Sequence, residues 1–199
     1  MKNIKTIFSS ALAIITWFCV VLQFCITEGS FMNTISYFTI LSNSLIAVSL
    51  SFSTFFPKTK LGIFFSNLSV QTAIALYITI VFLVYNTVLR GIWKPAGWQL
   101  FLDNMLHVLI PILYILYWLF FITKEKLNWK NGLYWLLFPL VYLIYSLIRG
   151  SIVDWYPYPF LNAAKLGYDK VIINIITMLL VFLISGSVLI AINNKFEKK

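Results

Sequence analysis

Six long apolar runs are the feature of this sequence that most restricts its fold. About 20 consecutive apolar residues cross the hydrocarbon core of a bilayer as an α-helix. Continuous runs of this length favour helices over the short alternating strands of a membrane barrel. The runs predict six spanning helices, over residues 7–27, 34–56, 68–90, 103–123, 132–149 and 170–192.

The bulk composition agrees with a single integral membrane domain over residues 1–199. Of these residues 61% are hydrophobic and 11% are charged, with a mean hydropathy of +0.90. A soluble domain carries about 25% charged residues, and a soluble fold of this length could not hide so much apolar surface. We therefore predict an all-α fold, a polytopic six-helix transmembrane bundle.

Lysine and arginine are distributed unequally between the two sides of the predicted bundle. The side with both termini carries Lys2, Lys5, Lys58, Lys60, Lys124, Lys126, Lys130, Lys195, Lys198 and Lys199. The other side carries only Arg90, Lys94, Arg149, Lys165 and Lys170. By the positive-inside rule, both termini are expected to be cytoplasmic, in a multi-pass protein of the plasma membrane. This rule explains the net charge of +9 without nucleic acid as a partner.

The sequence offers no group that would hold a metal or a cofactor. Cys19 and Cys25 both lie in the first apolar run without polar companions, so they suggest neither a disulfide framework nor a metal site. The spans contain no paired carboxylates, and the chain has no glycine-rich phosphate loop and no HExxH motif. We expect no cofactor and no metal.

Polar side chains from five of the predicted spans fall at a similar depth, near the side opposite the termini. They are Thr39, Asn43, Asn86, Arg90, Asp103, His107, Arg149, Asp169 and Asn174. Polar groups at membrane depth are costly and usually face the bundle interior or a wet cavity. We therefore predict a shared pocket that opens toward the outer face. The alternative is that these groups only bond neighbouring helices to one another.

His107 is the only histidine of the chain and the strongest candidate for chemistry. Asp103, one helical turn earlier, can fix the tautomer of the ring and leave the other nitrogen free as a base. Thr39 lies at a matching depth, and Ser36 lies nearer the water. A hydroxyl nucleophile with a histidine base is therefore the chemistry that remains. Donors for an oxyanion could come from Tyr37, Asn43, Asn86 and Arg149.

Two further features bear on a cavity near this layer. Pro111 and Pro139 lack the N–H that would bond to the carbonyls of His107 and Trp135, so we expect a kink in each helix. Such kinks can be packing features or can open a space between helices. The outer segment 150–169, rich in aromatic residues and prolines, suits either an aromatic belt at the membrane surface or a lid over a site.

Four segments resemble the bacterial Pr-six-Pr membrane proteins, in order and over nearly the whole chain. They are "YFTILSN" (37–43), "DNMLHVLIPILYILYW" (103–118), "WLLFPLVYLIYSLIRG" (135–150) and "WYPYPFLN" (155–162). That family looks like a distant relative of the eukaryotic androgen-induced membrane hydrolases. These multi-spanning enzymes cleave fatty acid esters of hydroxy fatty acids with a threonine nucleophile and a histidine base. The resemblance implies these roles for Thr39, which lies in an aromatic–Thr–x–x–Ser–Asn setting, and for His107.

Depth and resemblance thus favour an intramembrane hydrolase of lipid esters, with Thr39 as nucleophile and His107 as base near the outer face. A lipid or acyl-ester substrate and the membrane are the expected partners. The supporting or substrate-binding residues would be Asn43, Asn86, Asp103, Arg149 and Asn174. One alternative is a transporter or binding protein for an amphipathic or lipid molecule, with no catalysis. Another is a structural membrane protein whose polar layer only joins helices.

Overall fold

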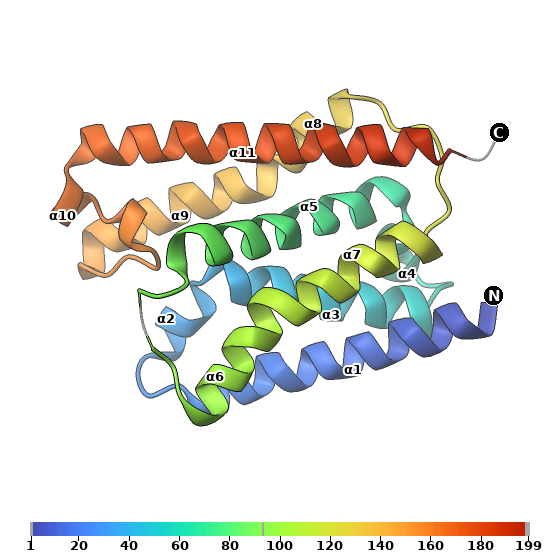
Figure 1. Ribbon diagram of the computed structural model, residues 1–199, viewed down its shortest axis with the longest axis horizontal. Coiled ribbons are helices and arrows are strands. Elements are labelled where there is room, and N and C mark those ends of the chain that lie inside the picture. Colours follow the sequence, from blue (N-terminus) through green and yellow to red (C-terminus); the bar gives the residue numbers. More distant parts are fainter. Residues whose placement is uncertain (1, 93, 198–199) are drawn as a thin grey trace.

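The computed structural model describes residues 2–92 and 94–197 and is all-helical (Figure 1). Six segments are long and apolar enough to cross a membrane, as in a multi-pass membrane protein. They are Asn3–Ile26, Phe38–Phe55, Leu68–Leu89, Gly97–Phe121, Lys130–Val153 and Tyr168–Lys195. The predicted number of spans is therefore confirmed. Lys198 and Lys199, which contributed to the predicted orientation, lie outside the described residues.

The helical elements follow one another with short connections. The first half contains α1 (Lys2–Ile26), α2 (Phe31–Ile35), α3 (Phe38–Phe55), α4 (Lys60–Ser66), α5 (Leu68–Val84) and the π-helical turn η1 (Tyr85–Leu89). The second half contains α6 (Gly97–Asn104), the π-helical turn η2 (Met105–Leu109), α7 (Ile110–Phe121), α8 (Lys130–Trp135), α9 (Leu137–Val153), η3 (Pro159–Leu161), α10 (Ala163–Leu166) and α11 (Tyr168–Lys195). The two ends of the chain lie at the same end of the bundle (Figure 1).

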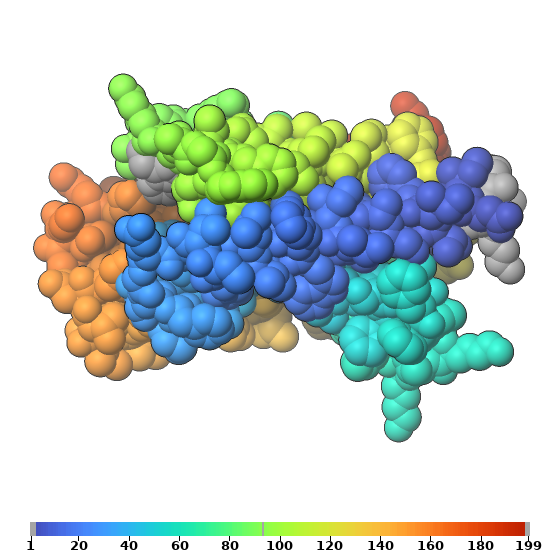
Figure 2. All heavy atoms as spheres, turned by 90° about the horizontal axis from the view of Figure 1, so that it is seen from below, coloured from blue at the N-terminus to red at the C-terminus, as the bar shows by residue number. Residues whose placement is uncertain are grey.

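Helix α5 forms the centre of the bundle and packs against α3, α7 and α11. Of the span that contains it, 61% of the residues are buried, against 17% for the span of α8 and α9 and 22% for α11. Helix α1 packs against α3 and α7, and Figure 2 shows it along one face beside the α6–α7 segment. Helices α9 and α11 therefore form the side of the bundle most open to lipid.

The predicted starts of the second and fourth spans are wrong. The backbone of Tyr37 is extended, with φ −76° and ψ 129°, so the helix predicted from 34 divides into α2 and α3. Thr39 therefore lies in the first turn of α3. The fourth span begins at Gly97 rather than at 103, because Gly97 adopts a positive φ of 57° that lets the chain turn into the helix. His107 consequently lies deeper within its span than the sequence suggested.

The two prolines affect their helices in different ways. The helix divides into α8 and α9 at Leu136, one turn before Pro139, and the carbonyl of Trp135 accepts a hydrogen bond of 2.8 Å from the hydroxyl of Tyr77. Where a kink was predicted, the helix is divided next to Trp135, whose carbonyl lacks its usual helical partner. At Pro111 the chain stays helical, and the turn before it widens into η2, which contains His107. Such π-helical turns occur often at functional sites.

Candidate active site

The structure brings Thr39 and His107 together across the bundle. The Oγ1 atom of Thr39 lies 3.2 Å from Nε2 of His107, so the first turn of α3 meets η2. Both side chains are largely shielded, with 6% of Thr39 and 14% of the His107 side chain exposed. A hydroxyl and an imidazole at this separation have the geometry of a nucleophile and its base.

Asp103 fixes the other nitrogen of the imidazole in two ways. Nδ1 of His107 lies 2.9 Å from the backbone carbonyl oxygen of Asp103 and 3.3 Å from its carboxylate oxygen Oδ1. Both oxygens only accept, so Nδ1 carries the hydrogen and donates it. In the neutral ring this tautomer places no hydrogen on Nε2, which can then accept the hydroxyl proton of Thr39.

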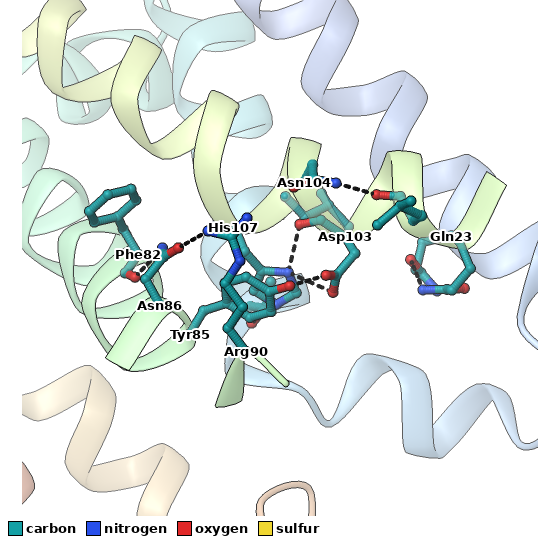
Figure 3. A network of polar contacts seen from close by, with 12 residues as sticks. Gln23, Phe82, Tyr85, Asn86, Arg90, Asp103, Asn104 and His107 are labelled. Carbon is teal, nitrogen blue, oxygen red and sulfur yellow. Dashed lines mark hydrogen bonds and ion pairs between the residues drawn. The ribbon is translucent and has the colours of Figure 1, made fainter. Parts of the chain in front are cut away.

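Tyr85 holds the ring and the carboxylate together. Its ring stacks on that of His107, with centroids 4.1 Å apart and planes 14° apart. Its hydroxyl donates to Oδ2 of Asp103, which is 3% exposed. Figure 3 shows Tyr85 beside His107, with Asp103 bonded to both. Because Tyr85 lies in η1 and His107 in η2, two π-helical turns meet at this site.

Tyr158 approaches Thr39 from the segment that follows α9. Its hydroxyl oxygen accepts a hydrogen bond from the Thr39 N–H at 3.4 Å and lies 3.5 Å from Thr39 Oγ1. Burial raises the pKa of Tyr158 to about 12, so the phenol stays protonated near neutral pH and can donate. Of the two interpretations of segment 150–169, the structure favours a cover over the site.

Helix α3 also presents its N-terminus to the site. The first N–H groups of a helix have no partner one turn earlier, and they carry a partial positive charge. Thr39 is the second residue of α3, so its hydroxyl and N–H lie in this region. Negative charge that develops near Thr39 Oγ1 is therefore favoured by the backbone as well as by the Tyr158 hydroxyl.

Asn43 lies on α3 one turn after Thr39 and bonds to the backbone next to the site. Its side-chain N–H₂ group donates to the carbonyl of Thr39 at 2.8 Å and to the carbonyl of Leu106 at 3.1 Å, and the residue is fully buried. These two bonds join α3 to η2. Because both carbonyls already occupy this donor group, Asn43 positions Thr39 and His107 and does not point at a substrate.

The remaining supporting residues predicted from the sequence have their hydrogen bonds away from Thr39: those of Asn86 lie within its own helix, whereas Arg149 and Asn174 each join two segments. Asn86 accepts from Arg90 at 2.9 Å on the surface, and the side chain of Asn174 donates to the Phe160 carbonyl at 2.8 Å. Arg149 donates to Asn33 at 2.6 Å, and its guanidinium also lies over the ring of Trp155. The predicted oxyanion role of Asn86 and Arg149 finds no geometric support, since both face partners outside the site. Ser36, the other candidate hydroxyl, lies 2.7 Å from the hydroxyl of Tyr145.

Two cavities meet at the site. One, of about 380 Å³, has an almost wholly apolar wall from α5, α9 and α11. The other, of about 590 Å³, has polar side chains in its wall, among them Gln23, Glu28 and Lys94. Thr39, His107 and Tyr158 line both. Thr39, His107 and Tyr158 thus lie between an apolar cavity and a more polar one.

Tyr85 and Tyr158 were not predicted from the sequence. Tyr158 lies in the "YPYPF" stretch, whose specific pattern was a usable signal. The sequence analysis selected Asn86, the residue after Tyr85, because it assumed a regular α-helix with 3.6 residues per turn. The π-helical turn η1 changes which residue of this segment faces His107. Only the folded backbone shows which of these two neighbours faces His107.

Comparisons of the chain with models of protein families, with characterised proteins and with solved structures give no match. Among the described residues, His, Cys, Asp and Glu form no group of three that could hold a metal ion. Function is therefore inferred from the geometry of Thr39, His107 and their neighbours.

Proposed function

We infer that this protein is an intramembrane hydrolase of lipid esters, with Thr39 as the nucleophile and His107 as the base. The observation that carries this proposal is the 3.2 Å contact between Thr39 Oγ1 and His107 Nε2, with Nδ1 of the same ring held by Asp103. This is the arrangement of nucleophile, base and orienting group that recurs in acyl transfer on unrelated folds.

The reaction would begin with attack of Thr39 Oγ1 on the ester carbonyl carbon, while Nε2 of His107 takes the hydroxyl proton. The oxyanion would receive hydrogen bonds from Tyr158 and from the first turn of α3. The bond to the alcohol oxygen then breaks, and His107 returns the proton to that oxygen. A water molecule, deprotonated by His107, next attacks the acyl group on Thr39 and releases a carboxylic acid with the hydroxyl restored.

A lipid substrate fits the setting of the site. One side of the dyad faces an apolar cavity among membrane-spanning helices, and the other faces a polar cavity that can supply water. With both termini in the cytoplasm, as the lysine and arginine distribution predicts, the site would serve the outer leaflet. The resemblance to membrane hydrolases of fatty acid esters supports the same substrate class.

Turnover by the purified protein in detergent tests this proposal. Hydrolysis of p-nitrophenyl butyrate should fall by about 10³-fold or more in Thr39→Ala and in His107→Ala, because either change removes the reacting unit. Thr39→Ser should retain measurable turnover. Thr16→Ala is a matched control, because Thr16 is equally buried but bonds only to the Leu12 carbonyl within α1.

The structural alternative predicts a different pattern. If the Thr39–His107 contact only joins helices, both alanine variants should lower the thermal unfolding midpoint and leave the turnover per folded molecule unchanged. That pattern, or equal hydrolysis by the wild type and Thr39→Ala, would exclude the proposed enzyme.

A further inference from the structure

The apolar cavity extends from Thr39 along the bundle axis. Its wall includes Leu143 and, further from the site, Leu136 on the α8–α9 side, and it includes Ile175 and, further on, Phe182 on α11. Each pair is seven residues apart, which corresponds to about 10 Å of helix. An extended chain of ~1.5 Å carbon–carbon bonds advances about 1.3 Å per carbon, so this length holds roughly eight carbons.

This cavity is open on one side. Leu140 of α9 and Leu179 of α11 both line it, yet 52% and 44% of their surfaces are exposed. On other sides the wall is closed by buried side chains such as Phe38, Tyr142 and Phe182. The opening therefore lies between α9 and α11, the two helices with the most exposed spans.

The surface around this opening is apolar. Val141 and Ile144 of α9 and Leu180 of α11 are each at least half exposed. These residues lie within the membrane-spanning parts of α9 and α11. In a membrane, their exposed side chains would therefore contact the acyl chains of the lipids. A fatty chain can thus pass sideways from the bilayer into the cavity without crossing water.

The second cavity differs in its chemistry and its surroundings. Glu28, Lys94 and Gln99 on its wall are exposed, and they lie in or next to the loops at the end opposite the termini. An ester held at Thr39 would therefore have its two parts in different surroundings. The acyl chain would lie in the apolar cavity, and the alcohol would lie in the cavity with polar side chains.

We propose that the acyl chain of the substrate reaches Thr39 sideways from the bilayer, between Leu140 and Leu179, and that the alcohol leaves through the polar cavity. This proposal rests on the hydrolase function inferred above and specifies its substrate: an ester with a membrane-embedded acyl chain and a polar alcohol. A chain longer than the cavity extends through the opening into the lipid.

The test compares two substrates on variants that narrow the opening. Leu140→Trp and Leu179→Trp should lower kcat/KM for p-nitrophenyl palmitate by roughly tenfold or more, as a blocked hydrophobic pocket does. The same variants should lose much less of their kcat/KM for p-nitrophenyl butyrate, because its short chain stays beside Thr39, so the ratio of the palmitate to the butyrate value should fall. Val141→Trp and Leu180→Trp are matched controls, since these neighbours face lipid and do not line the cavity.

Palmitate hydrolysis at the wild-type rate by both Trp variants would overturn the proposed route. If a Trp variant loses both substrates, Leu140→Phe and Leu179→Phe decide: selective loss of palmitate supports the route, and parallel loss excludes it. The hydrolase itself is tested separately by Thr39→Ala. If this variant still cleaves butyrate, the proposed function fails, whereas inactive Thr39→Ala with unselective Trp variants refutes only the route.

Discussion

Asp103→Asn should reduce turnover by a moderate factor, because the carboxylate is only one of two groups that hold His107. The backbone carbonyl of Asp103 accepts from Nδ1 at 2.9 Å, closer than the carboxylate oxygen at 3.3 Å. The variant therefore keeps the tautomer that leaves Nε2 free. In serine protease triads the corresponding change costs about 10⁴-fold, because the ring is held in the wrong tautomer.

What the variant loses is the negative charge beside the imidazolium that forms during attack. Hydrogen bonds to charged groups contribute about 1.5–3 kcal/mol. At 1.36 kcal/mol per tenfold in rate, this corresponds to a fall in kcat of about 10- to 150-fold. Tyr85→Phe provides a control that removes a donor to the same carboxylate without changing its charge, and we expect it to cost less.

The assay is kcat for p-nitrophenyl butyrate, measured with wild type, Asp103→Asn and Tyr85→Phe in the same detergent, with the thermal unfolding midpoint recorded for each. A loss of about 10⁴-fold in a folded Asp103→Asn variant would mean that the carboxylate alone sets the tautomer. An unchanged kcat would mean that no imidazolium forms next to Asp103. The first result would refute the sharing of the Nδ1 hydrogen bond between the two oxygens, and the second would refute the role of His107 as the base.

Three further predictions concern neighbouring contacts. Tyr158→Phe should lower kcat by about 10²-fold through loss of an oxyanion donor. Because burial raises the pKa of Tyr158 to about 12, the turnover of the wild type should not decline near pH ~10, where an ordinary phenol ionises. Asn43→Ala should destabilise the protein by about 1–3 kcal/mol and reduce turnover, since it frees two carbonyls that join α3 and η2. Gly62→Ala should lower only the thermal unfolding midpoint, because a Cβ there would lie 2.0 Å from the Phe56 carbonyl oxygen at the far end of the bundle.

Much of the fold follows from hydrophobicity alone. The number of spans and their approximate positions depend on run length, which the bilayer thickness determines. The starts of α3 and of the span from Gly97 depend instead on single backbone conformations, at Tyr37 and Gly97. No hydropathy pattern contains that information.

The candidate site was predictable to the extent that polar groups are rare in membrane spans. Thr39, His107, Asp103 and Asn43 stood out on an apolar background, and the structure places them together. Asn86, Arg149 and Asn174 stood out equally, yet Asn86 bonds within its own helix, and Arg149 and Asn174 join segments elsewhere, as the helix-joining alternative expected for the whole layer. Depth separates residues along the membrane normal, but it does not say which way a side chain faces.

The central claim is that Thr39 forms a covalent acyl-enzyme, and a fluorophosphonate probe tests it most directly. After reaction with a long-chain alkyl fluorophosphonate, peptide mass spectrometry should find the phosphonyl adduct on Thr39, with labelling lost in Thr39→Ala and strongly reduced in His107→Ala. Equal labelling of the wild type and Thr39→Ala, or an adduct on another residue, would contradict the account.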